Sequence, residues 1–309
     1  MRASLLALLL LSGCAGTPQL DALREAPPAG PARAELHDVP FFPQKEAQCG
    51  PAALATLLVW GGADVSPAQL GPQVYLPKRR GSLQLELLAA ARRYGRVPYV
   101  LRPRLADVLA EISAGHPVLV LQNLSLSWYP RWHFAVVVGF DRQTEHVVLR
   151  SGTHRRRRTP LDIFERTWAR SEYWAAVVLP PQEAPATARE LPYVEAVAGL
   201  EQLEDWAAAR QGYRTALRRW PRSLTARVGL GNAAYALGDL DAAEQAYRAA
   251  VRQYPQAASA HNNLATVLLK QKRLAEAERA ARRAVALGGS LTPTYEQTLA
   301  EILSQQSAR

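Results

Sequence analysis

A cysteine at the start of an apolar run is the residue of this chain best suited to nucleophilic chemistry. Cys49 is followed by Pro51 and by three leucines at helical spacing (Leu54, Leu57 and Leu58), which predicts a helix with one buried face. Pro51 suits a first helical turn, because its missing N–H leaves no hydrogen bond unmade there. The orphan amides and the positive end of the helix dipole would favour a thiolate at Cys49.

Such a cysteine needs a base, and His133 is the best placed of the 6 histidines. It opens an apolar strand directly after the aromatic loop 123–132, where its ring can project into a cleft. Both residues also have ordinary interpretations. A free cysteine is often buried for structural reasons, and His133 could be a hydrogen-bonded framework residue. The rings at 128–132 could line the cleft or pack the loop onto the sheet.

Four segments in order carry a family resemblance: VPFFPQ ending at Gln44, CGPAAL from Cys49, GHPVLVL from 115 and WHFAVVVGFD around His133. Together they resemble the C39-like, papain-fold cysteine peptidases over roughly residues 36–180. The resemblance implies an α+β fold in which a nucleophile at a helix N-terminus faces a histidine on an antiparallel sheet.

The resemblance also implies a role for each matching residue. Cys49 would attack a carbonyl as a thiolate, and His133 would be the base and then the acid. Gln44 would donate its side-chain amide to the oxyanion, assisted by the backbone N–H of Cys49. Gln48 is the second candidate for that donor, although it is adjacent to Cys49 and less able to reach across.

The third catalytic position departs from the family pattern, in which Asp or Asn orients the histidine. The corresponding strand reads HVVLRSG, so Ser151 occupies the expected position. A serine can accept a hydrogen bond from imidazole, but it stabilises an imidazolium less than a carboxylate does. Asn123 and Asp141 are the other candidates. Either one of these groups orients His133, or catalysis is weak, or the fold is used for binding.

The elements that must position these residues follow from apolar spacing. Helices are expected after Ser66-Pro67 and over 83–94 and 105–113, and strands over 99–101, 117–122, 133–139, 145–150 and 173–179. Helices first and strands later, without alternation, predict an α+β domain rather than a doubly wound sheet. The basic run 154–158 could bind anions such as lipid headgroups or an acidic substrate, but a solvated hairpin turn is the more ordinary interpretation.

A repeat with a period of 34 residues follows the prolines at 180, 181 and 185. It aligns Ala209 with 243 and 277, Tyr213 with 247, Ala216 with 250 and 284, and Pro221 with 255. Both the period and the pattern are similar to tetratricopeptide repeats, which implies an all-α solenoid that holds a peptide or partner protein. Asn232, Asn262 and Asn263 are polar candidates on its surface. The alternative is that the array only stabilises the first domain.

The amino terminus predicts export. Residues 1–13 carry one basic residue and a short apolar run, which fits a signal peptide. The segment Leu11-Ser12-Gly13-Cys14 resembles a bacterial lipobox, which implies acylation of Cys14, and Ala15 after it implies the outer membrane. An ordinary secretory signal is the alternative. With Cys14 lipidated, Cys49 would be the only free thiol of a protein in an oxidising compartment.

Composition bounds the remaining possibilities. A chain of 309 residues with formal charge +10 has room for two cores, and its basic residues form no nucleic-acid-binding module. Two cysteines exclude a disulfide framework and a zinc site built from a cysteine cluster. We therefore expect no nucleic acid, no cofactor and no metal.

Together these patterns predict an envelope lipoprotein on the outer membrane, facing the periplasm, which hydrolyses amide bonds in a peptide or protein. A silent binding scaffold and an acyl transferase with the same dyad are the alternatives. The expected segments are a signal peptide (1–13), a lipidated cysteine and flexible tether (14–34), a C39-like peptidase domain (35–182), a linker (183–188) and a repeat domain (189–309, with repeats 189–222, 223–256 and 257–290 and a C-terminal helix).

Overall fold

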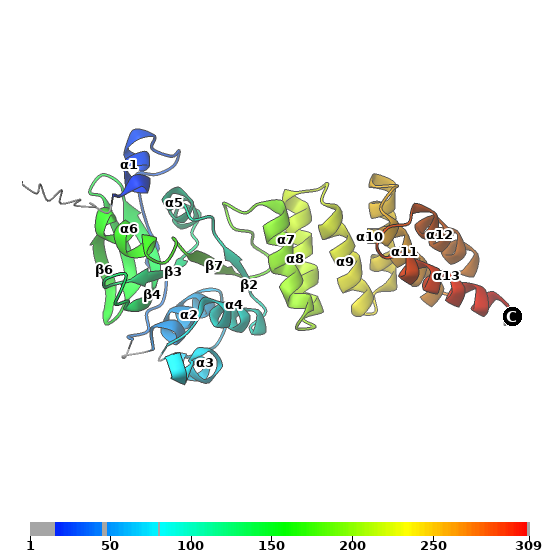
Figure 1. The fold of residues 1–309 in the computed structure, drawn as a ribbon, viewed down its shortest axis with the longest axis horizontal. Coiled ribbons are helices and arrows are strands. Elements are labelled where there is room, and N and C mark those ends of the chain that lie inside the picture. The colour runs from blue at the N-terminus through cyan, green and yellow to red at the C-terminus, as the bar shows by residue number, and fades with distance from the viewer. Residues whose placement is uncertain (1–15, 45–47, 80, 308–309) are drawn as a thin grey trace, which may run out of the picture.

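The computed structural model describes residues 16–44, 48–79 and 81–307 (Figure 1). The signal peptide and Cys14 lie outside these residues, so their assignment stays a prediction. Among the helices that the structure describes, none combines the length and the apolar character needed to span a bilayer.

An antiparallel sheet of 7 strands is the framework of the first domain, with the order β2-β7-β3-β4-β5-β6 and with β1 paired to β4. Its strands are β1 (Arg33–Glu35), β2 (Val97–Val100), β3 (Val118–Asn123), β4 (Trp132–Asp141), β5 (His146–Ser151), β6 (His154–Pro160) and β7 (Ala175–Leu179). The central strand β3 is buried along its whole length. It pairs with β4 and β7, which matches the continuous apolar sequence expected of a strand covered on both faces.

Helices cover both faces of this sheet. One face packs against α2 (Cys49–Trp60), α3 (Pro67–Val74) and α4 (Gln84–Arg93). The other packs against α1 (Pro18–Glu25), α5 (Leu105–Ser113) and α6 (Leu161–Ala169). Neighbouring residues of β3 divide between the two layers, with Leu119 on the α2 side and Val120 on the α5 side. The fold is therefore the α+β arrangement that the sequence predicted.

The prediction of a flexible tether over residues 14–34 is wrong for much of this segment, which is folded onto the domain. Leu20 of α1 is 1% exposed. The carboxylate of the buried Glu165 accepts the backbone N–H groups of Gln19 and Leu20 at 2.9 and 2.7 Å. This acceptor satisfies amides that the first turn of α1 would otherwise leave unpaired. The strand β1 then joins a further part of the same segment to the sheet, where it pairs with the last residues of β4.

The basic run 154–158 is also not a turn. It forms most of β6, a strand that pairs with β5 along one edge of the sheet. Arg156 donates to the carboxylate of Glu35 at 2.7 and 2.8 Å. Charged side chains of this kind protect an exposed edge strand from pairing with another chain.

Seven helices follow and extend in a row away from the sheet (Figure 1). They are α7 (Glu190–Glu201), α8 (Trp206–Arg219), α9 (Leu224–Ala236), α10 (Leu240–Gln253), α11 (Ala258–Lys270), α12 (Leu274–Leu287) and α13 (Thr292–Ser307). The alanines that recur every 34 residues are fully buried between paired helices, as at Ala209, Ala243 and Ala277. Glycine allows a still closer approach at Gly231, where a Cβ would lie 2.4 Å from the ring of Tyr247.

The asparagines expected on the repeat surface instead bond within the array or are buried. Asn232 accepts hydrogen bonds from the Tyr247 hydroxyl at 2.7 Å and from the Asn263 amide at 3.2 Å. Asn262 is 7% exposed. These contacts tie neighbouring helix pairs together, so Asn232 and Asn263 contribute to the stacking of the repeats.

Candidate active site

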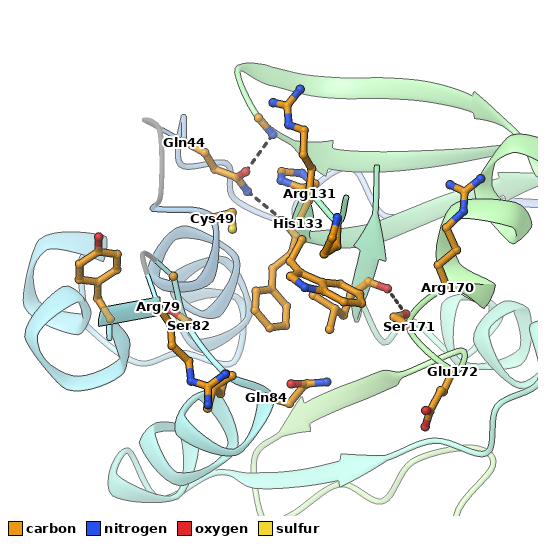
Figure 2. Close-up of a pocket in the computed structure, with 18 of the residues that line it drawn as sticks. Gln44, Cys49, Arg79, Ser82, Gln84, Arg131, His133, Arg170, Ser171 and Glu172 are labelled. Atoms are coloured by element: carbon orange, nitrogen blue, oxygen red, sulfur yellow. Dashed lines mark hydrogen bonds between the residues drawn. The ribbon is translucent and has the colours of Figure 1, made fainter. Parts of the chain in front are cut away.

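A cleft of about 1490 Å³ opens over the N-terminus of α2 and contains the residues expected to do chemistry (Figure 2). One wall comes from residues 75–79 and 81–84, between the end of α3 and the first residue of α4. The opposite wall comes from the end of β3, the start of β4 and the segment 170–172 after α6. Gln44, Cys49 and His133 line the cleft between these walls. The structure therefore brings together three of the residues that the sequence singled out.

Cys49 is the first residue of α2 and is partly buried. The helix after it is covered almost completely, with Gly50 to Leu58 all buried. Gly50 has no room for a side chain, because a Cβ there would lie 2.4 Å from Ser82 Oγ. This close contact holds the cleft wall at Ser82 against the first turn of α2, next to Cys49.

His133 is the second residue of β4 and is oriented by Ser151, the last residue of β5. Its Nε2 atom lies 2.9 Å from Ser151 Oγ, and Ser151 is 2% exposed. Since Ser151 occupies Nε2, the other ring nitrogen, Nδ1, is left for the cleft. When Nε2 carries the proton and donates it to Ser151, Nδ1 has the free lone pair that a general base requires.

The other two candidates for the orienting group lie elsewhere. Asn123 Oδ1 accepts the backbone N–H groups of Ser125 and Arg131 at 3.0 and 2.9 Å, so this side chain shapes the aromatic loop. Asp141 is at the far end of β4, where its carboxylate accepts the amides of Gln143 and Thr144. Among the described residues, Ser151 is the hydrogen-bond partner of the His133 ring.

Gln44 is held in place by Gly152, which follows Ser151 in the turn between β5 and β6. The Gly152 N–H donates to Gln44 Oε1 at 3.0 Å, and the Gln44 N–H donates to the Gly152 carbonyl at 3.0 Å. Gln44 Nε2 donates a long hydrogen bond of 3.5 Å to the Phe134 carbonyl. Because Gly152 fixes the amide oxygen, the NH₂ group of Gln44 is directed toward β4, and Figure 2 shows this side chain above Cys49. Gln48 is exposed at the N-cap of α2.

The electrostatics favour the neutral forms of Cys49 and His133. Burial raises the pKa of the Cys49 thiol, although hydrogen bonds from backbone groups of Phe134, Gly50 and Cys49 itself lower it in part. Burial, together with the positive charges of Arg157 and Arg131, lowers the pKa of His133 to about 4. An uncharged Ser151 does nothing to counter these positive charges. The geometry therefore fits a thiol beside a neutral imidazole better than a permanent ion pair.

Arg150 is a buried residue whose role the sequence did not indicate. It is 4% exposed, and its guanidinium donates to the carbonyls of Val39 at 3.0 Å and Arg155 at 2.6 Å. These bonds join the segment that leads to Gln44 with the hairpin that carries Ser151. Arg150 therefore holds together two parts of the site without touching the cleft.

Only part of the aromatic loop lines the cleft. Trp132 lines the cleft, whereas Trp128 and Tyr129 are 81% and 66% exposed and do not line it. Gly152 and the arginines of the cleft walls were also not foreseen. The Ser-Gly pair at the end of β5 is a turn signal that could have pointed to Gly152.

Comparison with known proteins agrees with this architecture. A model described as "Peptidase_C39 like family" matches residues 36–176, and one described as tetratricopeptide repeat matches residues 199–258 and 230–291. The first domain thus has the C39-like fold, and the run of helices after it matches tetratricopeptide repeats over residues 199–291. None of the curated proteins is similar enough to this sequence to count as a relative.

Solved structures resemble the two parts separately. A C39-like peptidase structure from Bacillus anthracis is 19% identical, with 48% of this chain and 97% of that chain covered and a TM-score of 0.41. The secretion chaperone SycD from Yersinia enterocolitica is 19% identical, with 37% and 83% covered and a TM-score of 0.36. The TPR2B domain of yeast Sti1, solved as a complex with pHsp70, is 19% identical, with 37% and 98% covered and a TM-score of 0.35.

Proposed function

We propose that this protein is a cysteine peptidase that hydrolyses amide bonds of a polypeptide in the cleft above α2. The observation that carries the proposal is the hydrogen bond of 2.9 Å between His133 Nε2 and Ser151 Oγ. It leaves Nδ1 as a base in the same cleft as a cysteine at a helix N-terminus.

In the proposed mechanism, His133 Nδ1 takes the proton of the Cys49 thiol as the sulfur attacks the substrate carbonyl. The backbone N–H of Cys49 and the side-chain amide of Gln44 stabilise the oxyanion. His133 then donates the proton to the leaving amine, and the C–N bond breaks to leave a thioester on Cys49. Water, deprotonated by His133, hydrolyses the thioester and restores the thiol.

A binding protein without catalysis is the second candidate, and the shifted pKa values favour it. A thiol with a raised pKa beside a histidine with a pKa of about 4 is a weak nucleophile at neutral pH. In that case the cleft would hold an extended peptide without cleaving it. An acyl transferase differs from the peptidase only in the acceptor, because an amine replaces water at the thioester.

The proposal extends to the setting in which the enzyme acts. The repeats, as modules that commonly bind proteins, would recruit the polypeptide substrate or an envelope partner. Lipidation of Cys14 would anchor the chain to the outer membrane and place the cleft in the periplasm. Since α1 begins at Pro18, only a few residues would separate the lipid from the folded domain.

The test is to incubate the purified protein with a complex library of unlabelled peptides and to identify new N-termini by mass spectrometry. A peptidase produces cleavages that are absent with Cys49→Ala and with His133→Ala. His37→Ala is the matched control, because His37 is exposed and does not line the described cleft.

Adding glycine amide to the same reaction separates the alternatives. Products joined to glycine amide would identify an acyl transferase. Identical peptide profiles for wild type and Cys49→Ala would contradict both enzymatic functions and leave the binding protein.

A further inference from the structure

The walls of the cleft carry an excess of positive charge. Arg79 belongs to the wall formed by residues 75–79 and 81–84, and Arg131 and Arg170 belong to the opposite wall. Glu172 is the acidic residue among those that line the described cleft. Figure 2 shows Arg79 and Arg131 on opposite sides of Cys49, with Arg170 farther along the second wall.

These charges are not neutralised by the described part of the chain. No carboxylate among residues 16–44, 48–79 and 81–307 forms an ion pair with Arg79, Arg131 or Arg170. Arg170 gives one hydrogen bond of 3.1 Å to the Asn123 carbonyl. Other arginines near the sheet do have acidic partners, for example Arg156 with Glu35. Arg158 of β6 also has no acidic partner among the described residues, but it does not line the cleft. What distinguishes Arg79, Arg131 and Arg170 is that their unpaired charges face the same cleft.

A second observation is that positive charge on the cleft wall acts on His133. Arg131 and Arg157 both contribute to the lowered pKa of His133, so their positive potential extends to the reacting groups. Cleft walls of low dielectric concentrate such a potential and favour ligands of opposite charge.

We propose that the polypeptide bound in this cleft is acidic next to the reacting bond, with two adjacent carboxylate side chains paired to Arg79 on one wall and Arg131 on the other. Successive side chains of an extended chain point to opposite sides, so neighbouring Asp or Glu residues would face the two walls. Arg170 would favour a further acidic residue along the same path. That the bound polypeptide is a substrate rests on the proposed function. The preference of the cleft for acidic peptides does not.

The test measures binding without chemistry, using Cys49→Ala and fluorescence anisotropy. The probe is a fluorescein-labelled decapeptide of glycine and alanine with two adjacent glutamates, and the reference peptide has glutamines at those positions. An exposed ion pair contributes about threefold to affinity, so two pairs predict that the glutamate peptide binds about tenfold more tightly in low salt. The preference should largely disappear in 0.5 M sodium chloride (about 4 Å of Debye screening).

Single substitutions in the same background locate the effect. Arg79→Gln and Arg131→Gln should each weaken binding of the glutamate peptide about threefold and leave the glutamine peptide unchanged. Arg158→Gln is the matched control, because it removes the same charge from an exposed strand position outside the cleft lining. All of these side chains are exposed, so circular dichroism should show folded variants.

Equal binding of the two peptides would overturn the inference. So would a loss with Arg158→Gln as large as that with Arg131→Gln, because binding would then occur on the basic edge strand. Binding to phosphatidylglycerol vesicles would identify a lipid surface as the ligand if it requires Arg79 and Arg131 while binding of the glutamate peptide does not. If the charge-dependent binding holds but wild type cleaves no peptide, only the proposed function fails.

Discussion

Ser151 is the residue that most affects the chemistry available to this cleft. It orients the His133 ring through a hydrogen bond of 2.9 Å, which is the geometry that a third catalytic member would provide. It provides no negative charge, however, and Arg131 and Arg157 contribute to lowering the His133 pKa. The residue therefore separates two functions that a carboxylate would combine, namely orientation of the ring and stabilisation of the imidazolium.

Ser151→Asp should make Cys49 more reactive at mildly acidic pH. A carboxylate next to the ring would raise the His133 pKa from about 4 by roughly 1–3 units, which favours transfer of the thiol proton to His133. We expect iodoacetamide to alkylate Cys49 about tenfold faster at pH 6, measured on the Cys49 peptide by mass spectrometry.

Ser151→Asn is the control for this substitution, because an amide can accept the same hydrogen bond without adding charge. If Asn accelerates alkylation as much as Asp does, charge is not the cause. An unchanged rate in the Asp variant would mean that residue 151 does not influence the His133 base.

At the scale of elements, the site depends on a contact between two segments that are far apart in the chain. Arg150 of β5 binds the carbonyls of Val39 and Arg155 and so joins the approach to Gln44 to the β5–β6 hairpin. Gln44 adds its own hydrogen bonds to Gly152. Cys49, His133 and Ser151 belong to three different elements, so their relative positions depend on these connections.

Arg150→Met should destabilise the protein by about 2–4 kcal/mol, because it leaves buried carbonyl groups without donors. The free energy of unfolding can be measured in urea with circular dichroism. Arg158→Met, on the exposed strand β6, is the matched control and should cost less than about 0.5 kcal/mol. A loss for Arg150→Met no larger than that of the control would contradict the role of Arg150.

The sequence predicted those elements whose own residues specify them. The helix 105–113 and the buried strands follow from apolar periodicity, and the structure has them as α5 and as β3, β4, β5 and β7. The sequence did not predict α1 and α6, because these helices depend on partners that are distant in the chain. Glu165 of α6, for example, accepts hydrogen bonds from the first turn of α1. The sequence also favoured a turn over residues 154–158, where the structure has the strand β6 paired with β5.

The candidate site was also predicted only in part. Cys49, His133 and Gln44 follow from local patterns and the family resemblance, and they do line one cleft. Ser151 was preferred over Asn123 and Asp141 by its place in the family pattern, but the residues alone could not decide the choice, because it depends on strand register and on the turn at Gly152. The arginines of the cleft walls lie on three separate segments, and nothing in their local sequence indicates that they converge.

At the scale of the whole molecule, the two domains share one hydrophobic core. The cluster that includes Tyr99 and Val120 of the sheet continues through Tyr193 of α7 and Tyr213 of α8 to Ala226 of α9. The predicted linker between them is bound tightly. Glu111, which is fully buried, accepts hydrogen bonds from the Thr187 N–H at 2.7 Å, the Ala186 N–H at 3.1 Å and the Thr187 hydroxyl at 2.6 Å.

A shared core predicts that the sheet and the first repeats unfold together. Glu111→Gln should lower the free energy of unfolding of this joint transition by about 2–3 kcal/mol, because it weakens charge-assisted bonds to buried donors. Circular dichroism and tryptophan fluorescence in urea measure it, with the exposed Glu195→Gln as the control. Two separate transitions in the wild type, with only one shifted by Glu111→Gln, would show that the domains fold independently.

The central claim is that His133 takes the proton of Cys49, and the rate of Cys49 alkylation as a function of pH tests it most directly. Because the pKa of His133 is about 4 and burial raises the pKa of the Cys49 thiol, the two form little ion pair at equilibrium. His133 instead takes the thiol proton in the transition state, as the sulfur attacks. We predict that His133→Ala slows alkylation by iodoacetamide at least about tenfold at pH 6–7, with the difference shrinking at high pH, where hydroxide ionises the thiol in both proteins. His37→Ala should follow the wild-type profile. Superimposable profiles for wild type and His133→Ala would contradict the account.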